Sequence, residues 1–235
     1  MTFTGTGEVS TTTTTTIAFG GVPAQLDALA EHSGSICMLT GALLEQATRS
    51  ACQTDRAAAH WVVAGAGGLD RQRGHAEELV VRLLALQAPV ATDLERVVSA
   101  LWIVGDVHRM GVLAIHVAQA TLRRYPEPLL PVAVRPVFAR MGRIGEQLAG
   151  HTAAALRLRD VVLAQGVSAR DPEMDRLHRE LLAAALDPSW PYGVAAAIDV
   201  CLLGRFYDRF ADHAAAVADR VIYQVTGHPW HADTA

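Results

Sequence analysis

The sequence of 235 residues contains neither lysine nor asparagine, and all 20 of its basic side chains are arginine. Codons for lysine and asparagine are AT-rich, so this bias indicates a GC-rich genome rather than selection for arginine chemistry. The 24 acidic residues outnumber the basic ones and give a formal net charge of −4. Because nucleic-acid-binding proteins are basic over their binding face, we expect no direct binding of nucleic acid.

Cysteine is scarce as well. Cys37, Cys52 and Cys201 are odd in number and lack the spacing of a metal finger, so we expect reduced, mostly buried thiols. The first 20 residues contain no basic residue, and no secretion signal is visible. The longest apolar stretch, residues 192–204, is interrupted by Asp199 and is too short to span a bilayer. These absences predict a soluble, cytoplasmic protein that reaches a membrane only through its partners.

The residues that are present favour helices. Hydrophobic residues make up 51% of the chain and charged residues 19%, which is typical of a globular protein. Alanine, the best helix former, dominates the apolar runs. We predict an all-α protein of two tandem, pseudo-symmetric three-helix bundles. The predicted order is a disordered low-complexity tail (1–21), the first bundle (22–128), the second bundle (129–228) and a C-terminal tail (229–235).

Prolines and glycines mark the expected helix ends. The predicted helices cover residues 23–60, 69–87 and 92–125 in the first bundle, and residues 135–165, 171–186 and 189–225 in the second. Between the first two, Gly65 and Gly67 resemble the start of a dinucleotide-binding loop. Asp70 stands where the third glycine of that motif belongs, and no strand–helix–strand context surrounds it. We therefore interpret the glycines as a helix break.

The chain also repeats itself about 100 residues apart. The segment around Arg109 returns around Arg209, which indicates a duplicated helical unit. Three apolar positions show the same offset: Ala114, Val117 and Ala118 correspond to Ala214, Val217 and Ala218. The two copies differ in their carboxylates, and this difference directs attention to the second copy.

In the second copy, aspartates occur in pairs four residues apart. Asp208 and Asp212 lie on the last helix, and Asp171 and Asp175 on the helix before it. Residues four apart are neighbours on a helix, so such carboxylates repel one another unless something compensates. Hard metal ions collect carboxylates, and the two pairs could converge on one metal cluster. The alternative is an ordinary solvated helix face.

Helical projection assigns the two faces of the last helix. Asp208, Asp212 and Asp219 share one face with Arg205. The opposite, apolar face is predicted to pack in the core and consists of Leu202, Leu203, Phe206, Phe210, Val217 and Val221.

The first copy lacks most of these carboxylates. Ala66 and Asp70 stand at the positions of the first aspartate pair, and His108 and Val112 at those of the second. The helix around His108 is apolar on almost every side. We therefore interpret His108 as a packed or hydrogen-bonded histidine rather than as a metal ligand.

Several stretches of the sequence resemble one known family. Residues 83–94 read LLALQAPVATDL, residues 106–109 read DVHR, residues 205–214 read RFYDRFADHA and residues 221–227 read VIYQVTG. Together with the helix order, they are similar to the PhoU family of phosphate-uptake regulators over residues 22–228. The form of residues 108–111, HRMG, and the absence of lysine are similar to actinobacterial members.

The resemblance implies a function by contact rather than by catalysis. It implies a negative regulator of the phosphate-starvation response and of high-affinity phosphate uptake, acting as an adaptor between the phosphate ABC transporter ATPase and a sensor histidine kinase. We expect no enzymatic activity and a homodimer. The expectation of no enzymatic activity agrees with the sequence, in which no nucleophile–base motif is apparent. The alternative is a metal-dependent enzyme or metal store that uses the carboxylates of the second bundle.

The resemblance also implies a metal site. Some members of the family bind iron or zinc clusters through paired carboxylates, one cluster in each bundle. Here Asp171, Asp175, Asp208 and Asp212 match that pattern, so we expect iron, zinc or magnesium at the second bundle, the alternative being no metal at all. In the first bundle the family's acidic residues are absent at Ala66, His108 and Val112, so we expect any metal binding to be asymmetric.

Overall fold

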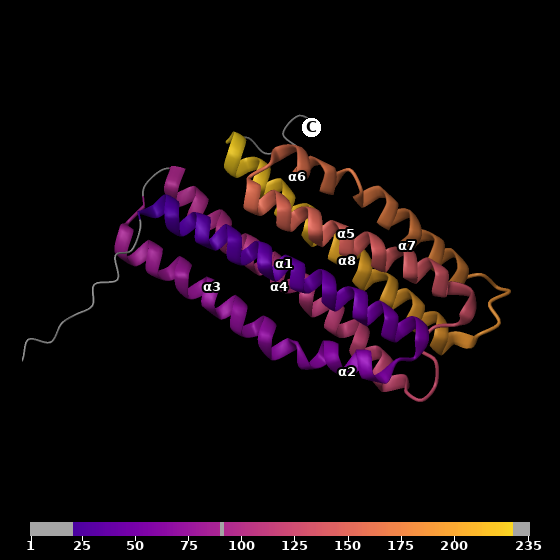
Figure 1. Cartoon of the computed structure of the whole chain (residues 1–235). Helices are drawn as coiled ribbons and strands as arrows, with labels where there is room; N and C mark the ends of the chain where they lie inside the picture. Colours follow the sequence, from indigo (N-terminus) through magenta and orange to yellow (C-terminus); the bar gives the residue numbers. More distant parts are fainter. Residues whose placement is uncertain (1–20, 90–91, 228–235) are drawn as a thin grey trace, which may run out of the picture.

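The computed structural model describes residues 21–89 and 92–227, and these residues form helices and no strands. The all-α prediction is confirmed (Figure 1). The elements are α1 (Val22–Gln53), α2 (Arg56–Ala64), α3 (Ala66–Gln87), α4 (Thr92–Arg124), the 3₁₀ turn η1 (Val132–Val134), α5 (Arg135–Leu158), α6 (Val161–Ser168), α7 (Asp171–Ala185) and α8 (Gly193–Thr226). Apart from Gly21, the predicted tails at 1–21 and 229–235 lie outside the described residues.

Each half of the chain forms a bundle with three arms. In the first bundle the arms are α1, then α2 with α3, then α4; in the second they are α5, then α6 with α7, then α8 (Figure 1). The middle arm of the first bundle is broken at Gly65, as predicted, whereas Gly67 lies inside α3 and is not part of the break. The two tandem three-helix bundles are therefore confirmed.

The first arm of each bundle ends earlier than predicted. We expected helices over residues 23–60 and 135–165, but α1 ends at Gln53 and α5 at Leu158. Each is followed by a residue in the left-handed conformation, Thr54 with φ 58° and Arg159 with φ 51°. An aspartate then caps the next helix: Asp55 accepts a hydrogen bond from the backbone N–H of Ala58 in the first bundle, and Asp160 from those of Val162 and Leu163 in the second. Such side-chain caps start a new helix.

The two bundles share one core. α1 and α5 pack closely because small residues face each other across them: a Cβ placed on Gly41 would lie 3.0 Å from the Cβ of Ala149. A Cβ on Gly142 would lie 2.5 Å from Oγ1 of Thr48. The Thr48 hydroxyl in turn lies 2.9 Å from that of Tyr207, which comes from α8. Buried residues from both halves belong to a single apolar cluster, so the bundles are joined by packing as well as by the chain.

The predicted core face of α8 is correct except at Leu202 and Phe206. Leu202 is 54% exposed, and Phe206 is half-buried. A helix of 34 residues meets different neighbours along its length, so one projection cannot describe all of it. The remaining residues predicted for this face are buried: Leu203, Phe210, Val217 and Val221.

α4 and α8 run antiparallel across the junction of the bundles. The Tyr223 hydroxyl near the end of α8 lies 3.2 Å from a Glu95 carboxylate oxygen near the start of α4. At the other end, Arg124 Nε donates to the Asp199 carboxylate at 2.8 Å. The two helices therefore begin at opposite ends of the molecule, α4 at the left and α8 at the right of the view (Figure 1).

The three cysteines are free thiols, with Cys37 buried and Cys52 and Cys201 partly buried. Burial raises the pKa of the Cys37 thiol to about 12. A thiol with such a pKa stays protonated at neutral pH and is a poor nucleophile. Of the expected buried thiols, Cys37 is buried as predicted, whereas Cys52 and Cys201 are buried only in part.

One helix of the described residues is long and apolar enough to cross a membrane, by length and composition alone. It is α4 over Asp93–Arg124, and not the stretch over residues 192–204 that the sequence singled out. Of its most apolar 18-residue window, 56% is buried inside the fold. The core helix of a globular protein meets the same criterion, so this is weak evidence for a membrane span.

Candidate functional site

Two of the four predicted aspartates meet between α7 and α8. The carboxyl group of Asp175 on α7 lies close enough to that of Asp208 on α8 for the two to interact. The pKa of Asp175 is raised, first by partial loss of hydration and then by its interaction with the Asp208 carboxyl group. The convergence of the two helices, which the paired spacing suggested, therefore occurs at this point.

Asp208 is buried, so the alternative of an ordinary solvated helix face is wrong for this residue. Asp208 is only 5% exposed because α7 packs over this side of α8 (Figure 1). His178 Nδ1 lies 3.3 Å from Asp208 Oδ2, and the guanidinium group of Arg205 donates to the same oxygen. A buried carboxylate needs such partners. His178 was missed in the sequence, although it follows Asp175 by three residues and so shares its helix face.

The other two predicted ligands are placed differently. Asp212 is exposed, and the side chain of Asp171 lies outside the described part of the structure. Among the described residues, no group of three or more His, Cys, Asp or Glu side chains is arranged to hold a metal ion. Asp175 and Asp208 thus supply half of a carboxylate set. Metal binding by all four aspartates stays a prediction.

The corresponding contact in the first bundle is a histidine–aspartate pair. His108 is 9% exposed, and its Nε2 lies 2.9 Å from Oδ1 of Asp70. The interpretation of His108 as a packed, hydrogen-bonded histidine is confirmed. His108 precedes Arg109 as Asp208 precedes Arg209, so the duplicated position is imidazole in one bundle and carboxylate in the other.

A second polar cluster, which the sequence did not reveal, joins the bundles to each other. Asp106 on α4 accepts hydrogen bonds from His213 Nδ1 at 2.9 Å and from Arg220 at 2.6 Å, both on α8. The Arg220 guanidinium also lies over the Trp102 ring at 5.1 Å from its centroid. These residues are more than 100 positions apart, so local spacing could not have shown the cluster.

Two exposed apolar stripes occupy equivalent positions in the repeat. The α4 stripe consists of Leu94, Val98 and Trp102, and the α8 stripe consists of Val194, Ile198 and Leu202. Within each stripe the residues are four apart, on one helix face, and each α8 residue lies 100 positions after its α4 counterpart. Because α4 and α8 begin at opposite ends (Figure 1), the stripes do too. Each stripe thus places three exposed apolar side chains in a row on the surface.

Comparison with known families explains the duplication. The family model described as the PhoU domain matches the chain twice, over residues 35–121 and 138–221. The chain belongs to the PhoU family. The two PhoU matches fall within the two halves of the chain that form the bundles, and the resemblance noted in the sequence is confirmed.

Proteins of mycobacteria are among its PhoU relatives. The chain is 44% identical over 203 residues to the "Phosphate-specific transport system accessory protein PhoU homolog 1" of Mycobacterium leprae, covering 86% of this chain and 91% of that protein. It is 45% identical over 203 residues to PhoU homolog 2 of Mycobacterium tuberculosis, covering 86% and 95%.

Solved PhoU structures share the fold. The crystal structure of the regulatory protein PhoU from Streptococcus pneumoniae matches with a TM-score of 0.77 at 20% identity, covering 88% of this chain and 98% of that one. PhoU from Pseudomonas aeruginosa matches with a TM-score of 0.76 at 23% identity, covering 88% and 99%. The double bundle is thus the PhoU architecture.

Proposed function

We propose that this protein is a cytoplasmic, non-enzymatic negative regulator of high-affinity phosphate uptake and of the phosphate-starvation response. It acts as an adaptor that binds the ATPase of a phosphate ABC transporter and a sensor histidine kinase. The observation that supports this most is the likeness, at 44% and 45% identity over 86% of the chain, to proteins named as accessory to a phosphate-specific transport system.

The paired stripes supply the surfaces that an adaptor needs. An amphipathic helix face that stays exposed can dock on an apolar groove of a partner. The α4 and α8 stripes lie at opposite ends of the molecule, so each can bind a different protein at the same time. Micromolar affinity, about −8 kcal/mol, is enough for a regulatory contact and is within the range of a small interface.

Charged substitutions on the stripes test this function. Ile198→Glu in the α8 stripe and Val98→Glu in the α4 stripe should each weaken binding of the purified ATPase or kinase cytoplasmic region at least about tenfold, because a charge is then desolvated at the contact. In cells, each variant should leave phosphate-transport genes expressed in high phosphate, as a gene deletion does. Binding is measured by calorimetry and expression by a reporter gene.

The matched control is Val162→Glu, at an exposed valine of α6 that belongs to neither stripe. This variant should bind both partners and repress normally. The proposal is wrong if the deletion strain still shuts off the phosphate genes in high phosphate. It is also wrong if folded stripe variants lose binding while regulation survives.

We further propose that any metal binds asymmetrically, at the second bundle. The carboxylate set there comprises Asp171, Asp175, Asp208 and Asp212, whereas Asp70 of the first bundle is paired with His108. Protein purified without chelators should lose iron, zinc or magnesium on replacement of both Asp208 and Asp212 by alanine, as measured by elemental analysis.

The control for asymmetry is His108→Ala, which should leave the metal content unchanged. An equal loss of metal from this variant would contradict the asymmetry. If the protein carries no metal at all, the aspartates form only a polar contact between helices. In that case His178 and Arg205 are the partners that stabilise Asp208. The enzyme or metal-store alternative is not favoured, because the relatives are accessory proteins.

A further inference from the structure

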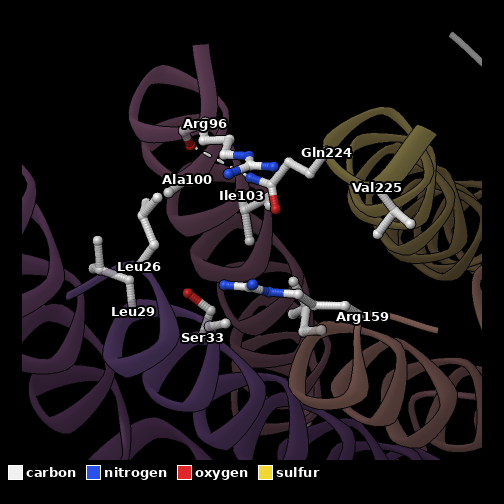
Figure 2. Close-up of a pocket in the computed structure, with 11 residues that line it drawn as sticks. Leu26, Leu29, Ser33, Arg96, Ala100, Ile103, Arg159, Gln224 and Val225 are labelled. Atoms are coloured by element: carbon white, nitrogen blue, oxygen red, sulfur yellow. Dashed lines mark hydrogen bonds between the residues drawn. The ribbon is translucent and has the colours of Figure 1, made fainter. Parts of the chain in front are cut away.

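A cavity of about 230 Å³ lies where the two bundles meet, at the end of the molecule at which α1 and α4 begin and α5 and α8 end (Figure 2). Its walls are mainly apolar and come from both bundles. Leu26 and Leu29 belong to α1, Ile103 to α4, Leu156 to α5 and Val225 to α8. The cavity exceeds the roughly 150 Å³ that suffices to bind benzene in an engineered apolar cavity.

The polar residues of the cavity wall are Ser33, Gln224 and two arginines, so its charged side chains are all cations. Figure 2 shows the Arg159 side chain extending across the cavity toward Ser33, with Arg96 on the α4 side. No carboxylate is among the lining residues that the structure describes. The cavity therefore presents two cations without an acidic residue in its wall.

Ser33 marks the bottom of the cavity. Ser33 is only 2% exposed, and its hydroxyl group points into the cavity (Figure 2). The Ser33 oxygen therefore faces the open space of the cavity, where it can hydrogen-bond to water or to a ligand. Buried hydroxyl groups are normally hydrogen-bonded, so a group aimed at an open space is suited to bind a ligand.

The two arginines are available to such a ligand. Arg159 pairs with Asp27, and both side chains are at least half exposed. Arg96 Nη1 lies 3.7 Å from a carboxylate oxygen of Asp93, also in an exposed pair. Exposed ion pairs contribute little to stability, so an anion in the cavity can compete for either guanidinium group at small cost.

We infer that this cavity binds a small amphiphilic anion, a carboxylate or phosphate group on a short apolar chain or single ring. The anionic group lies between Arg96, Arg159 and the Ser33 hydroxyl, and the apolar part lies against the leucine and isoleucine walls. Specific sites combine apolar lining with a few convergent polar groups in this way, and guanidinium groups bind carboxylate and phosphate well. This binding site is separate from the docking stripes and does not depend on the proposed function.

The repeat predicts one such site per chain. Arg159 follows the first arm of the second bundle in the left-handed conformation, as Thr54 does in the first. Thr54 is the position that the repeat relates to Arg159, and its uncharged side chain cannot replace a guanidinium group. A stoichiometry of one ligand per chain is therefore expected.

Calorimetry on the full chain tests the inference with four compounds. Sodium octanoate and octyl phosphate each have the anion and the chain, 1-octanol lacks the charge, and inorganic phosphate lacks the chain. At least one amphiphile should bind at one equivalent per chain, and at least about tenfold more tightly than either single-feature compound. The comparison between octanoate and octyl phosphate decides which head group is preferred.

Variants locate the site. Arg159→Gln and Arg96→Gln should each weaken binding of the preferred amphiphile about tenfold, the usual scale for one charge-assisted hydrogen bond. Ala100→Phe, which fills the cavity from α4, should abolish binding. The matched control is Arg176→Gln, an exposed arginine beside Glu180 that does not line the cavity, and it should bind normally. Circular dichroism confirms that each variant is folded.

Four results would overturn the inference: no binding of either amphiphile, equal binding of 1-octanol, equal binding of inorganic phosphate, or equal weakening by Arg176→Gln. If Ala100→Phe does not fold, the two arginine variants still decide the outcome. None of these results affects partner binding by the stripes, so failure here and failure of the proposed function are distinguishable.

Discussion

Replacing Phe210 by alanine should lower the free energy of unfolding by about 3–5 kcal/mol, the usual cost of truncating a fully buried phenylalanine. Phe210 is completely buried on α8. Its ring lies 3.5 Å from the position that a Cβ on Gly145 of α5 would occupy, so it packs directly against α5 and its removal would leave a cavity between the two helices. Chemical denaturation followed by circular dichroism measures the change.

Phe206→Ala is the matched control, on the same helix and with the same truncation. Phe206 is half-buried, and its ring faces that of His116 at 5.5 Å between centroids. Its loss should cost clearly less than that of Phe210, because less apolar area returns to water. A change below about 0.5 kcal/mol for Phe210→Ala, the range of surface sites, would show that α8 faces the core differently from the structure.

Gly142→Ala should destabilise the protein by about 1–3 kcal/mol, the typical cost of overpacking. The new methyl group would lie 2.5 Å from Oγ1, 2.6 Å from Cγ2 and 2.9 Å from Cβ of Thr48. Thr48 cannot swing away freely, because its hydroxyl lies 2.7 Å from the Leu44 carbonyl oxygen and 2.9 Å from the Tyr207 hydroxyl. The clash would push α1 away from α5.

The same substitution at Gly150 should have the opposite sign. Gly150 lies on the same helix, and a Cβ there meets nothing within 4 Å. Alanine is a better helix former than glycine, so Gly150→Ala should stabilise by about 0.5–1 kcal/mol. Thermal unfolding of the two variants side by side measures both. Equal effects at Gly142 and Gly150 would mean that the close approach of α1 and α5 does not exist.

The parts of the fold that depend on local pattern could be predicted from the sequence. Apolar periodicity and proline positions gave the helical class, the order of the arms and the duplication. The ends of α1 and α5 could not be predicted in the same way, because the left-handed residues there are Thr54 and Arg159 rather than glycine. The signal that was available is the aspartate after each of them, Asp55 and Asp160, which caps the next helix.

The candidate site was predictable only where repeated spacing pointed to it. The pair of Asp175 and Asp208 follows from aspartates four apart on adjacent helices. The burial of Asp208 does not, because it depends on α7 covering that side of α8, which only tertiary packing decides. The Asp106 cluster depends on the antiparallel crossing of α4 and α8, a relation between distant segments that no helical projection contains.

The duplicated position held by His108 and Asp208 has a consequence for how the molecule can diversify. In a symmetric assembly of two identical bundles, every substitution would appear in both bundles at once. Here both bundles are encoded in one chain, so a change in one bundle leaves the other intact. His108 and Asp208 show such a difference, because the equivalent position holds an imidazole in the first bundle and a buried carboxylate in the second. The two related halves of the molecule are therefore chemically distinct.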